Sequence, residues 1–318
     1  MPAEGSPASE FGLGTVRRRS GRCGLRARHV AVCMGVLLIL LAAGCAQAGR
    51  EEQGTGEDTS GGQTRQEKTS EGRTETTEAP FTAAPEISGG SDGTANGIRQ
   101  LTFERREGYE RAVIFFGSGG GLASGVPSWS LSSPEGEGYA RIAFPDVDLT
   151  LDSGGGFGGA ILDNFYVVRA PGGGLFVDLY ATGAFQYRVT ELSDPGRLVV
   201  DFRPASVDLS YPIPVQAQRT VVFEPRPREA TTSPLVVSGY SRNPEASNTV
   251  VLVDADGSVL ARSTVLSNDW LDTWGYFETT LEFPAFEGTA TLRVGAESAR
   301  DGSFEGAEVP VTYGGDGG

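Results

Sequence analysis

Short segments in which apolar and polar residues alternate recur along the chain beyond residue 98. Four of them are clear: VDLTLD (147–152), GLFVDLY (174–180), RLVVDF (197–202) and FETTLEF (277–283). A period of two places successive side chains on opposite faces of a β-strand, so each segment predicts a half-buried strand. The residues expected to face inward are Val147, Leu149, Leu151, Leu175, Val177, Leu179, Leu198, Val200, Phe202, Phe277, Thr279, Leu281 and Phe283.

Clusters of Gly, Pro, Asp and Ser separate these segments, and no stretch shows helical periodicity. Many short strands with turn signals between them predict an all-β protein built from β-sandwiches. The alternation pauses at RPASVDLSYPIPVQAQ (203–218), where three prolines favour an extended connection. We therefore expect a sandwich at residues 98–205, a linker at 206–218, a second sandwich at 219–313 and a flexible tail at 314–318.

An uncharged stretch, residues 30–46, follows a segment with six arginines between residues 17 and 28. It is barely long enough to cross a bilayer and ends in small residues, which favours a signal peptide over a membrane span. Its end, LAAGC (41–45), resembles the lipobox of bacterial lipoproteins. The resemblance implies a signal peptide at 1–44 and a lipid on Cys45. The protein would then be exported and anchored to the outer face of the cytoplasmic membrane.

Residues 45–97 are rich in Glu, Thr, Ser, Gly and Gln, and Phe81 is their only aromatic residue. Such a composition buries too little apolar surface to offset the loss of chain entropy, so we expect a disordered tether. As a random coil it would span roughly 40 Å and hold the sandwiches away from the membrane.

Cleavage before Cys45 would remove the only histidine, His29, and the other two cysteines, Cys23 and Cys33. That excludes Ser-His-Asp and Cys-His nucleophile systems, histidine metal centres and thiolate zinc sites, so we expect no enzyme activity, metal or cofactor. The whole chain carries 26 basic and 41 acidic residues, a formal net charge of −15. Such a chain is repelled by nucleic acid, which we exclude as a partner.

The first predicted sandwich contains GYERAVIFFG (108–117), VDLTLD and FQYRVTELSDPGRLVVDF (185–202). With these segments it resembles the AMIN-like domain of actinobacterial envelope proteins. The resemblance implies a β-sandwich, and related AMIN domains bind peptidoglycan and place cell-wall enzymes.

The second predicted sandwich resembles the immunoglobulin-like domain of bacterial spore-germination lipoproteins, the Gmad family. The matching segments are SPLVVSGYS (233–241), VVLVDADGSVLA (250–261), GYFETTLEF (275–283) and the stretch 288–313. The pairs Asp256-Gly257 and Asp301-Gly302 supply the positive φ that tight hairpin turns need. Where the family has Val-Phe-Glu, this chain has Asn-Pro-Glu at 243–245. The resemblance implies a module of envelope proteins rather than an enzyme.

Two motifs have both a functional and a structural interpretation. GGGFGG (154–159) fits G-x-G-x-x-G, but a strand-like segment follows it instead of a helix, which favours a hairpin loop over a nucleotide site. The carboxylates of Asp146, Asp148, Asp152 and Asp163 offer oxygens for Ca²⁺, but their spacing is not that of an EF-hand, and strand faces explain them better.

Aromatic residues are the candidate ligand-binding residues. Trp270, Trp274 and Tyr276 lie in DWLDTWGY (269–276), and Trp129 lies in GVPSWSLSSP (125–134). Exposed aromatic faces bind sugar rings, whereas the structural alternative is that an indole closes one end of a sandwich.

Together these observations predict a non-catalytic binding or scaffold protein of the cell envelope that contacts peptidoglycan or envelope proteins. The alternative is an accessory subunit of a membrane complex for transport or germination-like signalling.

Overall fold

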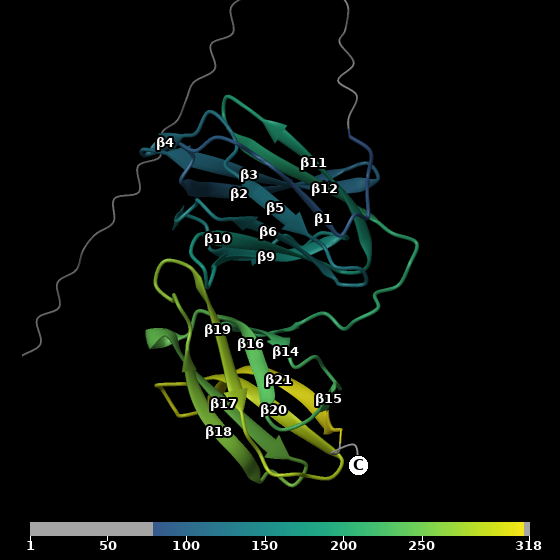
Figure 1. Ribbon diagram of the computed structural model, residues 1–318, viewed down its shortest axis with the longest axis vertical. Helices are drawn as coiled ribbons and strands as arrows, with labels where there is room; N and C mark the ends of the chain where they lie inside the picture. The colour runs from purple at the N-terminus through teal and green to yellow at the C-terminus, as the bar shows by residue number, and fades with distance from the viewer. Residues whose placement is uncertain (1–78, 315–318) are drawn as a thin grey trace, which may run out of the picture. The chain divides into compact units, whose positions relative to one another are not determined.

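The computed structural model describes residues 79–314, in which the regular structure consists of strands (Figure 1). This range contains no α-helix, and its one helical element is a short 3-10 turn, η1 (Pro244–Ala246). Among the described residues there is accordingly no helix able to cross a membrane. The all-β prediction is confirmed. Cys45, the predicted signal peptide and most of the predicted tether lie outside the described residues.

The first sandwich consists of two facing layers of strands. One layer has the order β11-β12-β3-β2-β7 with β4 beside β3, and the other has the order β1-β5-β6-β10-β9 with β8 beside β9. In chain order these strands are β1 (Glu86–Gly89), β2 (Gly97–Arg106), β3 (Tyr109–Ser118), β4 (Gly121–Leu122), β5 (Trp129–Ser132), β6 (Tyr139–Phe144), β7 (Leu149–Thr150), β8 (Gly154–Gly156), β9 (Leu162–Arg169), β10 (Leu175–Ala181), β11 (Phe185–Leu192) and β12 (Arg197–Pro204).

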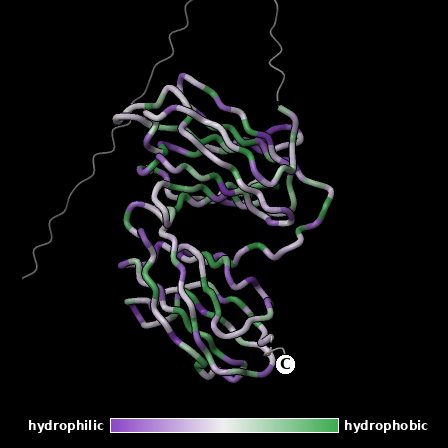
Figure 2. The backbone as a smooth tube through the Cα atoms, viewed as in Figure 1, coloured by the Kyte–Doolittle hydropathy of each residue, from purple (hydrophilic) through white to green (hydrophobic). Residues whose placement is uncertain are grey.

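Side chains from both layers fill the core of the first sandwich. The rings of Phe116 on β3 and Phe144 on β6 meet edge to face with centroids 5.3 Å apart, and both side chains are fully buried. The inward residues predicted in GLFVDLY and RLVVDF are all fully buried in the same core. Alternation along β10 and β12 was therefore a correct guide to their inner faces, and Figure 2 shows hydrophobic positions interspersed with polar ones along the strands.

The first sandwich begins earlier in the chain than predicted. Strand β1 lies inside the stretch assigned to the tether, yet it pairs with β5 from Glu86↔Ser132 to Gly89↔Trp129. The hydroxyl of Tyr187 also donates a hydrogen bond to the carbonyl of Ala84 (2.7 Å), and the backbone N–H of Thr82 donates to the carbonyl of Tyr187 (2.8 Å). Backbone pairing at a sheet edge needs no apolar composition, which is why composition placed the tether boundary too late at residue 97.

The segment VDLTLD does not form the strand predicted for it. Val147 is fully buried, but Leu149 is 62% and Leu151 is 73% exposed. Only two residues, Leu149 and Thr150, pair with β2, as the short edge strand β7. Asp152 turns inward, where its carboxylate accepts a hydrogen bond from the backbone N–H of Leu101 (3.0 Å). An edge position with so few pairs does not hold the chain in regular alternation, so the prediction for these two leucines was wrong.

The second sandwich also has two layers. Strands β13-β14-β16-β19 form one layer and β15-β21-β20-β17-β18 form the other. Their bounds are β13 (Val215–Gln216), β14 (Thr220–Glu224), β15 (Ala230–Thr231), β16 (Leu235–Ser241), β17 (Ser247–Asp254), β18 (Val259–Leu266), β19 (Trp274–Leu281), β20 (Thr289–Glu297) and β21 (Phe304–Tyr313).

The core and turns of the second sandwich follow the sequence pattern. Phe277, Leu281 and Phe283 are buried in its core. Gly257 has φ +85° between β17 and β18, and Gly302 has φ +74° between β20 and β21. Both glycines therefore have the positive φ expected of them in the connections between paired strands, because glycine adopts positive φ without steric cost.

The linker predicted at 206–218 is partly sheet. Val215 and Gln216 form β13, which pairs antiparallel with β14. Ile213 packs against the cluster between the sandwiches, and Pro214 is buried. The prolines identified an extended connection correctly, but the sequence did not show that its end joins a sheet.

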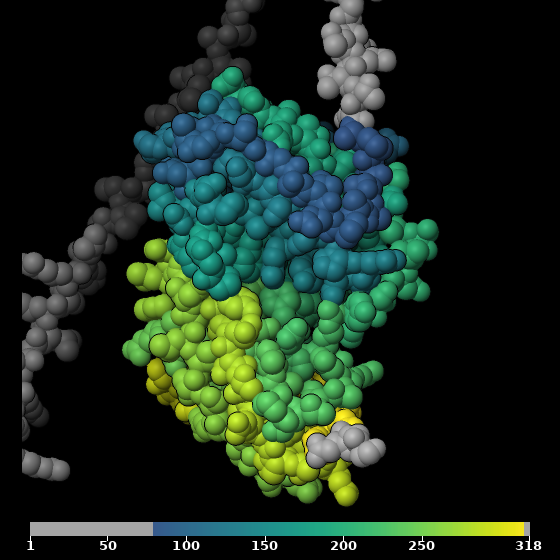
Figure 3. All heavy atoms as spheres, in the orientation of Figure 1, coloured from purple at the N-terminus to yellow at the C-terminus, as the bar shows by residue number. Residues whose placement is uncertain are grey.

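A third hydrophobic cluster joins the two sandwiches. Its buried members are Val168, Phe176, Tyr180, Val221, Tyr240 and Trp274. The hydroxyl of Tyr240 donates to that of Tyr180 (3.0 Å), and burial raises the pKa of both tyrosines well above the ordinary value. Strands β9 and β19 pair in parallel at Trp274↔Val168 and Gly275↔Arg169. In the space-filling view the atoms of the two sandwiches meet along this junction (Figure 3).

Candidate binding cleft

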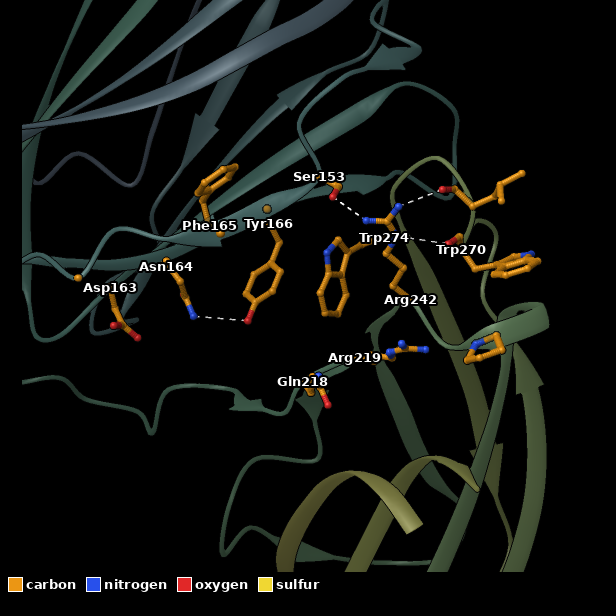
Figure 4. A pocket seen from close by; sticks show the side chains of 16 residues that line it. Ser153, Asp163, Asn164, Phe165, Tyr166, Gln218, Arg219, Arg242, Trp270 and Trp274 are labelled. Carbon is orange, nitrogen blue, oxygen red and sulfur yellow. Dashed lines mark hydrogen bonds between the residues drawn. The ribbon is translucent and has the colours of Figure 1, made fainter. Parts of the chain in front are cut away.

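A cleft of about 870 Å³ opens where β8 and β9 of the first sandwich face the second sandwich (Figure 4). The second sandwich contributes the residues that precede β14, the turn after β16 and the loop before β19. The lining residues are Ser153, Gly154, Gly155, Gly156, Gly158, Asp163, Asn164, Phe165, Tyr166, Gln218, Arg219, Arg242, Pro244, Trp270, Leu271 and Trp274.

Aromatic rings form the middle of the cleft. Trp274 meets Tyr166 edge to face with centroids 4.7 Å apart, and it also meets Tyr240 at 5.8 Å. Trp274 is buried, whereas Trp270 is 39% exposed. These packed contacts fix the orientation of the Trp274 ring, while Trp270 presents a free aromatic surface to solvent. Such surfaces suit the apolar faces of ring-shaped ligands.

A strand made only of glycine forms one side of the cleft. Gly154, Gly155 and Gly156 are exposed and pair antiparallel with Tyr166, Phe165 and Asn164. Because β8 has no side chains, the space above it stays open. GGGFGG is thus part of a hairpin, as the sequence favoured, and the strand β9 follows it rather than a helix.

A buried carboxylate holds the loop between β8 and β9. Glu110 is 4% exposed and accepts hydrogen bonds from the backbone N–H groups of Ala160 (2.7 Å), Ile161 (2.9 Å) and Leu162 (2.8 Å). The Arg105 guanidinium also donates to the carbonyl of Gly158. These bonds satisfy the amides of a glycine-rich loop that would otherwise have few restraints.

Arg242 connects the two sandwiches at one end of the cleft. Its Nη1 donates to Ser153 Oγ (2.7 Å), its Nη2 to the carbonyl of Leu271 (3.0 Å) and its Nε to the carbonyl of Trp270 (3.4 Å). All three acceptors are uncharged, so these contacts orient the guanidinium without neutralising its charge.

The opposite end of the cleft is polar. Asn164 donates to the side-chain oxygen of Gln216 (2.6 Å), and the hydroxyl of Tyr166 donates to the same oxygen (3.1 Å). The side-chain oxygen of Asn164 is buried and accepts no hydrogen bond from the part of the chain that the structure describes. Burial, together with the nearby charge of Asp163, raises the pKa of Tyr166 to about 12.

The structure brings together two of the four aromatic residues predicted to bind ligand. Trp270 and Trp274 line the cleft, but Tyr276 does not, and its hydroxyl donates to Glu278 (2.7 Å). Trp129 is 6% exposed in the core of the first sandwich, where its indole N–H donates to Glu191 (2.8 Å). Its faces are unavailable to a sugar, so the prediction for Trp129 was wrong and the structural alternative holds.

The four aspartates considered for Ca²⁺ have different surroundings. Asp146 is exposed in the turn after β6, Asp148 lies 3.8 Å from the Arg169 guanidinium, Asp152 accepts a hydrogen bond from a backbone amide, and Asp163 borders the cleft. Within residues 79–314 no group of three or more acidic, histidine or cysteine side chains could hold a metal ion.

Sequence reasoning missed Tyr166, Arg219 and Arg242. Tyr166 follows Phe165 in LDNFYVV, where Phe165 and Val167 face the core and Tyr166 faces outward. A large aromatic residue at an outward position is a signal that something covers or uses that face. Nothing local distinguishes the two arginines from other surface cations.

Comparison with known protein families gave a match over part of the chain. Residues 220–303 match the family model of the immunoglobulin-like domain of bacterial spore germination. Separate comparisons with curated proteins and with solved structures gave no significant match. The matched range begins in β14 and ends immediately before β21, so it covers most of the second sandwich. The second sandwich of this chain is therefore similar to the immunoglobulin-like domain of bacterial spore germination.

Proposed function

We propose that this protein is a lipid-anchored binding protein of the cell envelope, which holds wall glycan in the cleft between its sandwiches and does not catalyse a reaction. The observation that carries the proposal is the cleft itself, which Trp270, Trp274 and Tyr166 all line and in which Trp270 is exposed. Sugar rings have apolar faces that pack on aromatic side chains, and their hydroxyls need polar partners, which Asn164 and Gln218 supply.

The location predicted from the sequence supports the same function. LAAGC resembles a lipobox, so Cys45 would carry the lipid that keeps the protein on the outer face of the membrane. The residues between Cys45 and β1 would let the sandwiches reach the wall. The AMIN-like resemblance of the first sandwich favours peptidoglycan as the wall component bound.

The chemistry of the cleft favours binding over hydrolysis. Glycosidases use two carboxyl groups that flank the scissile bond, whereas Asp163 is the one carboxylate among the residues that line this cleft. The only histidine of the chain, His29, precedes the proposed cleavage site. A binding role therefore fits the lining residues better than a catalytic one.

The proposal can be tested by pull-down of the purified full chain on isolated peptidoglycan. We expect retention, and we expect Trp270→Ala to weaken it by up to about tenfold through loss of the stacking surface. Leu122→Ala is the matched control, because Leu122 is also exposed (57%) but lies on β4 of the first sandwich. Retention no greater than that of an unrelated β-sandwich would contradict wall binding.

One observation favours the accessory-subunit alternative. Strand β18 is at the edge of its sheet and exposes Val259 (61%) and Leu266 (66%). Unpaired edge strands can pair with a strand of another protein. Crosslinking in whole cells from position 263 on β18 separates the two functions, since a specific protein partner without glycan retention favours this alternative.

A further inference from the structure

The charge of the cleft is opposite to that of the chain. The chain as a whole has a formal net charge of −15, yet the residues that line the cleft include two arginines and one aspartate. Figure 4 shows them at different ends: Arg219 and Arg242 lie on the side of Trp270, and Asp163 lies beyond Tyr166. The cleft is therefore polarised, with its positive end beside the exposed indole.

Hydrogen bonds fix the backbone of Arg219, whereas its side chain is exposed at the cleft. Its carbonyl accepts a hydrogen bond from the N–H of Arg242 (2.9 Å), and the Ala217 N–H donates to the Thr220 carbonyl (2.8 Å) across the same turn. The side chain is exposed, and no described residue within 79–314 forms an ion pair or hydrogen bond with its guanidinium. An arginine presented in this way can bind a carboxylate through two parallel hydrogen bonds.

Arg242 strengthens the same end of the cleft. Its three hydrogen bonds all go to neutral oxygens, so its positive charge adds to that of Arg219. An anion would gain from both charges, and the aromatic rings beside them favour an anion attached to a ring over a free ion.

We propose that the cleft binds a saccharide that carries a carboxylate, with the carboxylate at Arg219 and the sugar ring on Trp270. This inference rests on the proposed function and adds the class and the orientation of the ligand. The uncharged part of the saccharide lies toward Asn164 and Gln218, whose amides meet hydroxyl and acetamido groups. The lone carboxylate at that end, Asp163, disfavours the reverse orientation by charge repulsion.

The test compares two probes on the purified full chain by titration calorimetry. Peptide-free wall glycan strands carry free lactyl carboxylates, and chitotetraose has similar sugar rings without them. We expect the wild type to bind the glycan strands about tenfold more tightly than chitotetraose, with the difference shrinking as salt increases. Arg219→Gln should remove most of this difference and leave chitotetraose binding unchanged.

The control for net charge is Arg262→Gln, because Arg262 is 57% exposed on β18 and pairs with Glu297. This variant should bind both probes as the wild type does. Equal affinity of the wild type for the two probes, unaffected by Arg219→Gln, would overturn the carboxylate preference and leave glycan binding intact. Binding of neither probe would contradict both the inference and the proposed function.

Discussion

Replacing Arg141 by glutamine is expected to destabilise the junction between the sandwiches. Arg141 Nε and Nη2 each donate to the carboxylate of Asp178 at 2.8 Å, and Asp178 is completely buried. The Arg141 guanidinium also lies over the rings of Phe176 (4.1 Å) and, in the second sandwich, Phe223 (4.9 Å). The substitution therefore leaves a buried carboxylate without its cation and removes a contact between the sandwiches.

The cost can be estimated from the geometry. Removing one partner of a buried ion pair costs about 3–5 kcal/mol. The Arg141 side chain is 28% exposed, so water can reach the ion pair and the lower end of that range applies. For a folded part of this size, 1 kcal/mol lowers the melting temperature by about 2–4 °C, which gives a decrease of about 6–12 °C.

Urea unfolding and scanning calorimetry would measure this effect. The double variant Arg141→Met/Asp178→Leu removes both charges and should cost much less than the sum of the two single variants. Arg262→Gln is the control, since its pair with Glu297 is exposed and should contribute less than about 1 kcal/mol. If Arg141→Gln cost no more than this control, or if the two single effects simply added, the pair would not have the role assigned to it.

Three further predictions concern the cleft loop, alkaline stability and a turn. Glu110→Gln should weaken three amide hydrogen bonds, lower the free energy of unfolding by about 2 kcal/mol and speed amide hydrogen exchange at residues 160–162. Unchanged exchange would contradict the role of Glu110. Tyr166 has a folded pKa of about 12, above the ordinary 10.0, so the stability it contributes is complete below pH 10 and is lost as the pH rises toward 12. Tyr166→Phe should remove that ionisation from an ultraviolet titration, and an identical titration curve would refute the assignment. Gly257→Ala should lower the free energy of unfolding, measured in urea, by about 1 kcal/mol because the φ of Gly257 is +85°. Gly93→Ala should change it little, because Gly93 has an ordinary φ and open space around it. Equal changes for the two variants would contradict this reasoning.

The lipid anchor has a direct test as well. Mass spectrometry of membrane fractions should find a diacylated Cys45 at the start of the chain, and Cys45→Ser should release the protein from the membrane. An unmodified Cys45 in membrane fractions would remove the anchor from the proposed function.

The sequence by itself determined the fold class and the inner faces of several strands. Leu175, Val177 and Leu179 alternate with other residues and are buried as predicted, and Gly257 makes its turn as predicted. These features are local: a period of two assigns side chains to faces, and an Asp-Gly pair sets a turn, whatever lies elsewhere in the chain. Alternation failed at Leu149, where the edge of a sheet gave the segment too few partners.

Only the tertiary structure decided what covers the outer faces and where the cleft lies. Phe176 and Tyr180 occupy the face of β10 opposite to the core, yet both are buried because the second sandwich docks on them. Likewise, Tyr166 and Trp274 meet at 4.7 Å although they lie on different sandwiches. A contact between segments so distant in the chain leaves no periodicity in either one, because it depends on how two complete surfaces fit together. The sequence pattern identifies strands within each sandwich, whereas the cleft depends on how the two sandwiches pack together.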